Sequence, residues 1–177
     1  MKNIFVVGTS GSGKSTLGKY LANKLNYRYL ELDALFWLPN WTKRDSAELK
    51  SMIEAEQSKP GGLVLDGNTL SKGAVISEGD VLIFLDYSRA LIVSRVLRRT
   101  IKRVLFRTEL WSGNREEGKF LFSRDPDINP VLWAFKTHYR RQAEYLELIE
   151  TLEGVKVHHI RTKGDLSKLK ATDPENF

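Results

Sequence analysis

The sequence contains no cysteine, which excludes disulfide bonds, thiolate metal sites and cysteine nucleophiles. It also lacks a long hydrophobic run, because the apolar stretch from Ile4 to Val7 ends at a glycine after four residues. That stretch is too short for the hydrophobic part of a signal peptide or for a membrane span. Internal repeats and low-complexity linkers are absent as well. These absences favour a cytoplasmic enzyme without a membrane partner.

The rest of the composition is typical of one globular domain. The chain has 177 residues, of which 41% are hydrophobic and 28% are charged. A domain of this length buries roughly 70% of the surface that its unfolded chain exposes, so it needs no stapling by disulfides or metals. We therefore expect residues 1–177 to form a single domain. The composition does not indicate an oligomeric state.

The positive charge is concentrated in one part of the chain. The net charge is +6, yet residues 89–124 hold ten Lys or Arg against three acidic residues, which gives +7 for this segment and −1 for the rest. A generally basic protein suggests a polyanionic partner such as DNA. A neutral protein with one basic segment suggests a local anion site. The charge distribution leaves both interpretations open.

Strands and helices are predicted to alternate along the chain. The predicted strands are 4–7, 27–32, 63–65, 81–85 and 155–160, and the longer helices are 14–25, 45–58, 88–106 and 130–152. Such alternation is typical of an α/β fold with a parallel sheet. In these sheets, ligands bind beyond the carboxyl ends of the strands. Four of the predicted ends carry Gly8, Asp33, Asp66 and Asp86.

Residues 8–15 read Gly-Thr-Ser-Gly-Ser-Gly-Lys-Ser and match the phosphate-loop pattern G-x-x-x-x-G-K-S/T without exception. The glycines let successive N–H groups converge on a phosphate, and the following helix adds the positive end of its dipole. We expect Lys14 to bind the β- and γ-phosphates and the Ser15 hydroxyl to coordinate Mg²⁺. The sequence therefore predicts a site for ATP and Mg²⁺. The residues predicted to hold the nucleotide are Gly8, Ser10, Gly11, Ser12, Gly13, Lys14, Ser15 and Thr16.

Phosphoryl transfer also needs a carboxylate near the metal, and two aspartates fit by pattern. Asp66 and Asp86 each follow a hydrophobic strand, and by pattern alone Asp86 is preferred because its strand is longer. Asp33 is a candidate acceptor ligand or general base for a hydroxyl. Aspartates in such places are also common as helix N-caps and turn residues. The pattern does not decide between these roles.

Several segments resemble the nucleoside monophosphate kinase superfamily, which includes the adenylate kinases. The phosphate loop, the Asp-Gly after the third predicted strand and FLDYSRALIVSRVLRR at 84–99 carry this resemblance. LDALFWLPNW, LDGN, DVLIFLDYSR and RTELWSGNRE are more closely similar to a small adenylate-kinase-like group known as DNA topology modulation proteins. The resemblance covers most of the chain, from Met1 to about Lys170.

The resemblance implies a three-layer P-loop NTPase fold with a five-stranded parallel sheet in the order 2-3-1-4-5. In that order the third strand lies beside the first, so Asp66 would face the Mg²⁺ at Ser15. The resemblance thus reverses the choice made from pattern alone. Asp66 becomes the expected metal-associated carboxylate, and Asp86 becomes a structural turn residue.

The acceptor region departs from the superfamily pattern. Nucleoside monophosphate kinases usually read Asp-Gly-Phe-Pro-Arg, with the arginine on the acceptor phosphate, whereas this chain reads Asp-Gly-Asn-Thr-Leu at 66–70. The resemblance therefore does not support an acceptor that bears a phosphate. It suggests that Asp33 and Asn68 bind hydroxyl groups of the acceptor, as equivalent positions do in kinases for gluconate or shikimate. Trp37 and Trp41 either stack on a base or sugar or anchor the loop.

A basic stripe runs along the predicted helix 88–106 and leads into an irregular segment. Its members recur at helical spacing and are Arg95, Arg98, Arg99, Lys102 and Arg103. Like charges at this spacing repel one another unless an anion is present. Residues 107–129 are too long for a connection without a function, and we interpret them as a lid that closes over ATP. The acceptor-binding region is expected at about 34–60.

By resemblance, Arg95 or Arg99 matches the arginine before the lid of such kinases, and Arg140 or Arg141 matches the one on the helix after it. The predicted catalytic residues are Lys14, Asp33, Arg99 and Arg140. The predicted function is ATP- and Mg²⁺-dependent phosphoryl transfer to a nucleotide or another small acceptor with a hydroxyl. The alternative is a P-loop ATPase or nucleotide switch associated with DNA or a protein partner. DNA is not favoured, because the basic segment contains no recognisable DNA-reading motif.

Overall fold

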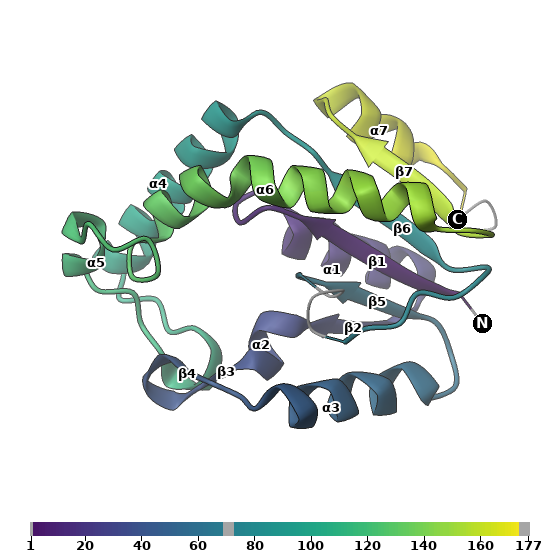
Figure 1. The fold of residues 1–177 in the computed structure, drawn as a ribbon, viewed down its shortest axis with the longest axis horizontal. Helices are drawn as coiled ribbons and strands as arrows, with labels where there is room; N and C mark the ends of the chain where they lie inside the picture. Colours follow the sequence, from purple (N-terminus) through teal and green to yellow (C-terminus); the bar gives the residue numbers. More distant parts are fainter. Residues whose placement is uncertain (1, 69–72, 174–177) are drawn as a thin grey trace.

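The computed structural model describes residues 2–68 and 73–173 as an α/β fold in three layers (Figure 1). The sheet consists of β1 (Asn3–Gly8), β2 (Arg28–Glu31), β5 (Leu63–Asp66), β6 (Val81–Leu85) and β7 (Lys156–Ile160). Its order is β2-β5-β1-β6-β7, and all four neighbouring pairs are parallel. Counted along the sheet strands alone, this is the order 2-3-1-4-5. The predicted parallel sheet and its order are therefore confirmed.

The helices cover both faces of the sheet. The longer ones are α1 (Lys14–Leu25), α3 (Ser46–Ser58), α4 (Arg89–Leu105), α6 (Pro130–Thr151) and α7 (Lys163–Ala171). Residues of α1, α4 and α7 pack with one face of the central strands, and residues of α3 and the second half of α6 pack with the other. Within β1, Ile4 and Val6 belong to the first of these clusters and Phe5 and Val7 to the second. A strand buried on both faces has this continuous apolar sequence.

Local sequence signals account for where several helices begin. The Asp45 carboxylate accepts hydrogen bonds from the Ala47 and Glu48 backbone N–H groups and caps α3. Asn129 caps α6 in the same way, with Pro130 at the first helical position. These side chains satisfy N–H groups that have no partner within the helix.

Two connections carry short elements of their own. Between β2 and α3 the chain forms α2 (Leu32–Phe36), β3 (Trp37–Leu38), the 3₁₀ turn η1 (Pro39–Trp41) and β4 (Thr42–Lys43). Because β3 pairs antiparallel with β4, and because these residues fall in the region where the sequence predicts acceptor binding, we call residues 37–43 the acceptor hairpin. The predicted second strand ends earlier than expected, at Glu31, because Leu32 turns into α2 and its side chain is fully buried. Asp33 therefore lies on a short helix beyond the sheet.

The connection between α4 and α6 contains the 3₁₀ turn η3 (Trp111–Gly113) and α5 (Lys119–Phe122). An isolated antiparallel bridge joins Glu109 to Arg115, so the segment folds back on itself. In Figure 1 this connection reaches the acceptor hairpin at the end of the molecule opposite to both termini. Within the described residues, no helix has the length and apolarity needed to cross a membrane.

Candidate active site

The phosphate loop, residues 8–15, joins β1 to α1 and packs tightly against its surroundings. Gly8 has a φ of +144°, and a Cβ at this position would lie 2.6 Å from the Leu85 carbonyl oxygen. Gly11 has a φ of +84°, and its Cβ would lie 2.5 Å from Cγ2 of Val96 on α4. Any larger residue at either position would displace the loop from the sheet or from α4.

The hydroxyl of Ser12 is buried and has no hydrogen-bond partner among the described residues. Buried polar atoms are nearly always paired, so an orphaned hydroxyl in this loop fits a site that is completed by a ligand. The loop geometry and this hydroxyl both fit a bound nucleotide phosphate.

Lys14 lies where the charges of the site meet, and its ammonium group donates a hydrogen bond of 3.0 Å to the Thr9 carbonyl oxygen. Burial lowers its pKa, whereas the negative charges of Asp33 and Asp66 raise it. The positive charges of Arg99 and Arg141 lower it further. Lys14 lies where the phosphate loop meets α1, and the other four side chains come from α2, β5, α4 and α6. The fold therefore brings charges from distant parts of the sequence close enough to act on Lys14.

Asp66 belongs to a polar group at the ends of β1, β2 and β5. Its carboxylate is 2% exposed and accepts a hydrogen bond of 2.8 Å from the Tyr29 hydroxyl. Burial raises the pKa of Asp66 to about 6, while hydrogen bonds from Ser15 and Tyr29 and the charge of Lys14 lower it. Glu31 is the register partner of Asp66 on β2, and the Ser15 hydroxyl lies 3.4 Å from its Oε1.

This group of Ser15, Asp66 and Glu31 suits a hard divalent cation, since it offers one hydroxyl and two carboxylates. Mg²⁺ is usually bound through one or two carboxylates together with substrate phosphates and waters. Within residues 2–68 and 73–173, no three His, Cys, Asp or Glu side chains gather into a metal cage made of protein alone. The donor set therefore fits a Mg²⁺ ion that arrives with a nucleotide.

Asp86, which the strand pattern alone preferred, is engaged elsewhere. Its Oδ1 accepts a hydrogen bond of 2.7 Å from Gln142 on α6, and its Oδ2 lies 2.8 Å from Nε2 of His159 on β7. Its backbone N–H donates to the Ile160 carbonyl oxygen. Asp86 thus fastens the end of β6 to α6 and β7, in keeping with the structural role that the resemblance implies.

Two arginines of α4 contact the phosphate loop. The Arg95 guanidinium donates to the Ser12 carbonyl oxygen at 3.2 Å, and Arg99 donates to the Ser10 hydroxyl at 3.3 Å. Burial lowers the pKa of Arg99, as does the charge of Arg103. The basic stripe therefore turns part of its charge toward the loop, which agrees with a local anion site.

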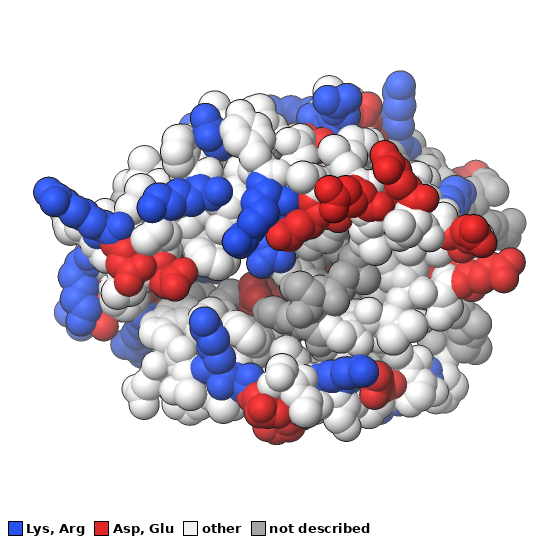
Figure 2. All heavy atoms as spheres, viewed as in Figure 1, with Lys and Arg blue, Asp and Glu red and all other residues white. Residues whose placement is uncertain are grey.

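The two neighbouring arginines of α6 differ in their surroundings. The Arg140 side chain is 62% exposed and lies against Glu144, 3.5 Å away. The Arg141 side chain is 17% exposed and lies 3.8 Å from the same carboxylate. The charge of Arg141 also acts on Lys14. Figure 2 shows basic side chains next to acidic ones along the α6 side of a hollow in the middle of this face.

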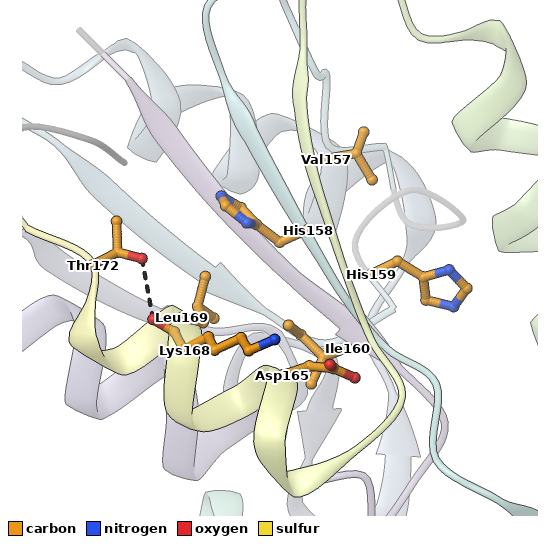
Figure 3. Close-up of a pocket in the computed structure, with 8 residues that line it drawn as sticks. All are labelled: Val157, His158, His159, Ile160, Asp165, Lys168, Leu169 and Thr172. Atoms are coloured by element: carbon orange, nitrogen blue, oxygen red, sulfur yellow. Dashed lines mark hydrogen bonds between the residues drawn. The ribbon is translucent and has the colours of Figure 1, made fainter.

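A cavity of about 310 Å³ lies next to the loop on the side of α7. Its lining residues are Gly11, Ser12, Gly13, Thr16, Leu17, Leu85, Tyr87, Arg95, Leu166 and Lys170. The Arg95 guanidinium lies over the Tyr87 ring, 4.7 Å from its centre. Because Tyr87 is only 4% exposed, its ring supports the Arg95 guanidinium, and a guanidinium plane can stack on a planar ring. A second cavity, of about 300 Å³, lies between β7 and α7, and none of the predicted site residues line it (Figure 3).

Asn68 follows the end of β5, and Asp33 lies on α2, the short helix that follows β2. The Asn68 side-chain oxygen accepts a hydrogen bond of 3.1 Å from the Tyr145 hydroxyl of α6. Asp33 acts electrostatically on both Lys14 and Arg99. The sequence prediction also involved Thr69 and Leu70, which lie outside the described residues.

Comparison with known proteins gives the family. Residues 10–57 match the model of the shikimate kinase family. A shikimate kinase of Vibrio vulnificus (strain YJ016) is 30% identical over 132 residues, which cover 70% of this chain and 71% of that enzyme. The chain belongs to the shikimate kinase-like family of P-loop kinases. The expected membership of the P-loop kinase superfamily is thereby confirmed.

Two further comparisons, one of sequence and one of structure, found similar proteins. The uncharacterized protein YqaC of Bacillus subtilis (strain 168) is 31% identical over 104 residues, and the match spans 58% of either chain. A structure of deoxyadenosine kinase from M. mycoides with bound dATP superposes with a TM-score of 0.52 at 13% identity. That superposition covers 94% of this chain and 96% of the other. It supports the fold alone.

Sequence reasoning missed two side chains near Asp66 and left the choice between Arg140 and Arg141 open. Tyr29 and Glu31 lie on β2 and come close to Ser15 and Asp66 only because β2 pairs with β5. We call these four residues the metal-site group, after the cation that their donor atoms suit. A signal was present, since Glu31 is an acidic residue inside an otherwise apolar strand end. Arg141 is distinguished from Arg140 only by the packing of α6, which no local pattern reveals.

The raised pKa of Asp66 predicts a pH-dependent effect on stability. The folded-state pKa of about 6 exceeds the ordinary value of 3.8, so the folded state binds the proton more tightly than the unfolded state. This contribution is fully present below pH 4 and is lost as the pH rises through 6. The Asp66→Asn variant has no carboxylate to ionise, so its free energy of unfolding does not fall in this way. We expect the variant to gain on the order of 3 kcal/mol in free energy of unfolding relative to wild type between pH 4 and pH 8.

Urea unfolding without Mg²⁺ across this pH range measures the difference directly. A mutant and wild type whose stabilities change in parallel with pH would show that Asp66 ionises normally.

Proposed function

We propose that the protein transfers the γ-phosphoryl group of ATP·Mg²⁺ to a hydroxyl of a small acceptor, either a nucleotide or another hydroxyl-bearing metabolite. One observation carries the proposal: the tightly packed phosphate loop contains Lys14, contacts Arg99 through Ser10, and contacts Asp66 and Glu31 through Ser15. The membership of a P-loop kinase family supports the same reaction type.

The residues around the loop would bind the nucleotide and its metal. ATP·Mg²⁺, when bound, supplies the phosphoryl group and a cation that shields its charge. Lys14 would bind phosphate oxygens, and Ser15 and Asp66 would hold the Mg²⁺, with Glu31 beside Ser15. The cavity lined by Tyr87 and Arg95 would take the nucleoside end, because it adjoins the loop and offers the guanidinium plane of Arg95 for stacking.

Asp33 would act as the general base toward the acceptor. In this step the acceptor oxygen forms a bond to the γ-phosphorus, the bond from that phosphorus to the bridging oxygen of ADP breaks, and the hydroxyl proton passes to the Asp33 carboxylate. Asn68 would orient the acceptor through its amide, which Tyr145 already fixes from α6.

Arginine charge would stabilise the phosphoryl group during transfer. Arg99 supports this role through its contact with Ser10 and its burial. For the arginine after the lid, Arg141 is better suited than Arg140, because its side chain is far less exposed and its charge acts on Lys14. Groups that are fixed in advance and shielded from water stabilise a developing charge most effectively.

The proposal is tested by ADP release from ATP·Mg²⁺, alone and with a panel of nucleotides, nucleosides and sugar acids. We expect one acceptor class to accelerate ADP release at least tenfold, and we expect Lys14→Ala to abolish the accelerated rate because it removes the phosphate-binding charge. Thermal melting of Lys14→Ala controls for folding. Slow ADP release that no acceptor changes would contradict the kinase function and favour a nucleotide switch.

The two strand-end aspartates provide a matched pair of variants. Asp66→Asn should lower Mg²⁺-dependent turnover by a factor of about one hundred or more, because it weakens the hold on the metal. Asp86→Asn should lower thermal stability, since it weakens the links to Gln142 and His159, and should leave turnover of the folded enzyme within about threefold. Initial rates titrated with Mg²⁺ distinguish the two. The opposite ranking would mean that Asp86 serves the metal.

The neighbouring arginines of α6 provide a second matched pair. Arg141→Ala should lower kcat by about one hundredfold to a thousandfold, which is the usual cost of removing one preorganised charge-stabilising group. Arg140→Ala should change kcat by less than about threefold, because its side chain is mostly in solvent. Steady-state kinetics with the accelerating acceptor measure both. A larger loss for Arg140→Ala would restore that residue as the catalytic arginine.

A further inference from the structure

The connection between α4 and α6 is fastened to the acceptor hairpin, although about 70 residues of sequence separate them. Four hydrogen bonds cross the contact between residues 111–115 and residues 37–41. Ser112 donates to the Trp37 carbonyl oxygen at 2.7 Å, and the Trp41 indole N–H donates to the Arg115 carbonyl oxygen at 3.3 Å. The other two involve Asn114. We call this contact the clasp.

Asn114 is the centre of the clasp. Its side-chain oxygen accepts from the Trp41 backbone N–H at 2.9 Å, and its amide nitrogen donates to the carbonyl oxygens of Leu38 and Trp111, both at 2.9 Å. The residue is 5% exposed. One buried amide therefore satisfies backbone groups on both sides of the contact, and removing it would leave these groups buried and unpaired.

The backbone on both sides of the clasp adopts conformations that side chains disfavour. Asn40, Trp41 and Ser112 have φ values of +59°, +56° and +56°. A left-handed conformation at tryptophan is a genuine outlier and persists only where the surroundings hold it. The hydrogen bonds of Trp41 to Asn114 and Arg115 provide that hold.

The clasp joins the two parts of the chain that carry Asp33 and Arg99. The hairpin continues directly from α2, which contains Asp33. The other side follows α4 and is tied back to that helix by an ion pair of 2.6 Å between Arg103 and Glu116, whose side chains are 19% and 8% exposed. Separation of the clasp would therefore release the acceptor side from the phosphate side.

We propose that Asn114 is a positioning residue that makes the acceptor hairpin and residues 109–115 open and close as one unit. The proposal deepens the proposed function and rests on it for its consequence. Closure over ATP sets the acceptor side at the same time, so nucleotide binding and acceptor binding are coupled. Such coupling is reciprocal, because each ligand favours the closed arrangement that the other needs.

Hydrogen exchange of the ligand-free protein tests the single unit without any activity. Segments that open together exchange with similar protection, so residues 37–43 and 109–115 should agree within about threefold in wild type. Asn114→Ala removes three hydrogen bonds and should speed exchange in both segments by about tenfold or more.

Asn129 supplies the matched control, since it is equally buried at 5% and also makes several side-chain hydrogen bonds. Those bonds reach Leu121, Ser123 and the start of α6, and none of them reaches the hairpin. Asn129→Ala should therefore speed exchange around residues 121–133 and leave 37–43 unchanged. Ser112→Ala, which removes one bond of the clasp, should speed both clasp segments by a smaller factor.

Adding a non-hydrolysable ATP analogue with Mg²⁺ then tests the coupling. In wild type the analogue should protect residues 8–15, 37–43 and 109–115, and in Asn114→Ala it should protect 8–15 but no longer 37–43. Three of the four tryptophans, Trp37, Trp41 and Trp111, lie at the clasp, so intrinsic fluorescence should follow the same pattern.

The outcomes separate the two proposals. If Asn114→Ala speeds exchange in 109–115 alone, or if the analogue still protects 37–43 in that variant, the single unit is refuted. If the analogue protects no segment of wild type, including residues 8–15, the proposed function fails, while the ligand-free comparison still decides whether the clasp joins the two segments.

Discussion

The structure depends on one constraint, which is the concentration of opposite charges at the carboxyl edge of a parallel sheet. The backbone of β1 ends in the phosphate loop, and the negative charges of Asp33 and Asp66 act there on Lys14. Burial lowers the pKa of this lysine, and the negative charges of the two carboxylates raise it. Without them, a cation in this position would be costly to bury. In the proposed function, the same two carboxylates serve the metal and the acceptor hydroxyl.

The remaining architecture serves to bring and hold charges at this edge. Pairing of β2 with β5 sets Tyr29 and Glu31 beside Asp66, and the packing of α4 against the loop delivers Arg99. Asp86 contributes indirectly, because it fastens β6 to α6 and β7 and so fixes the helix that carries Arg141. The clasp joins the acceptor hairpin to the connection that follows α4. A site built this way depends on contacts between elements and not on any single loop.

Much of the fold followed from the sequence, because its signals are local. The buried strand of β1, the phosphate-loop spacing and the alternation of strands with helices predicted the parallel sheet, and the family resemblance supplied its order. That strand order also predicted that Asp66 lies close to Ser15. Pattern alone had favoured Asp86, because strand length says nothing about which strands are neighbours.

The parts that the sequence did not reveal arise from long-range packing. Tyr29 enters the metal-site group through strand register, and Arg141 differs from Arg140 only in how α6 faces the sheet. In the sequence, Asn114 is one of several polar residues in an irregular segment. Only the structure shows that it binds the hairpin. In each case the decisive partner lies far away in the sequence, where periodicity and motif spacing carry no information.

The central claim is that the phosphoryl group passes to an acceptor oxygen and not to water. Phosphorus NMR of a reaction in water enriched with heavy oxygen measures this directly. The account predicts a phosphorylated acceptor whose new bond carries the acceptor's own oxygen, with ADP formed in equal amount. Inorganic phosphate that carries heavy oxygen, formed at the same rate whichever acceptor is present, would contradict it.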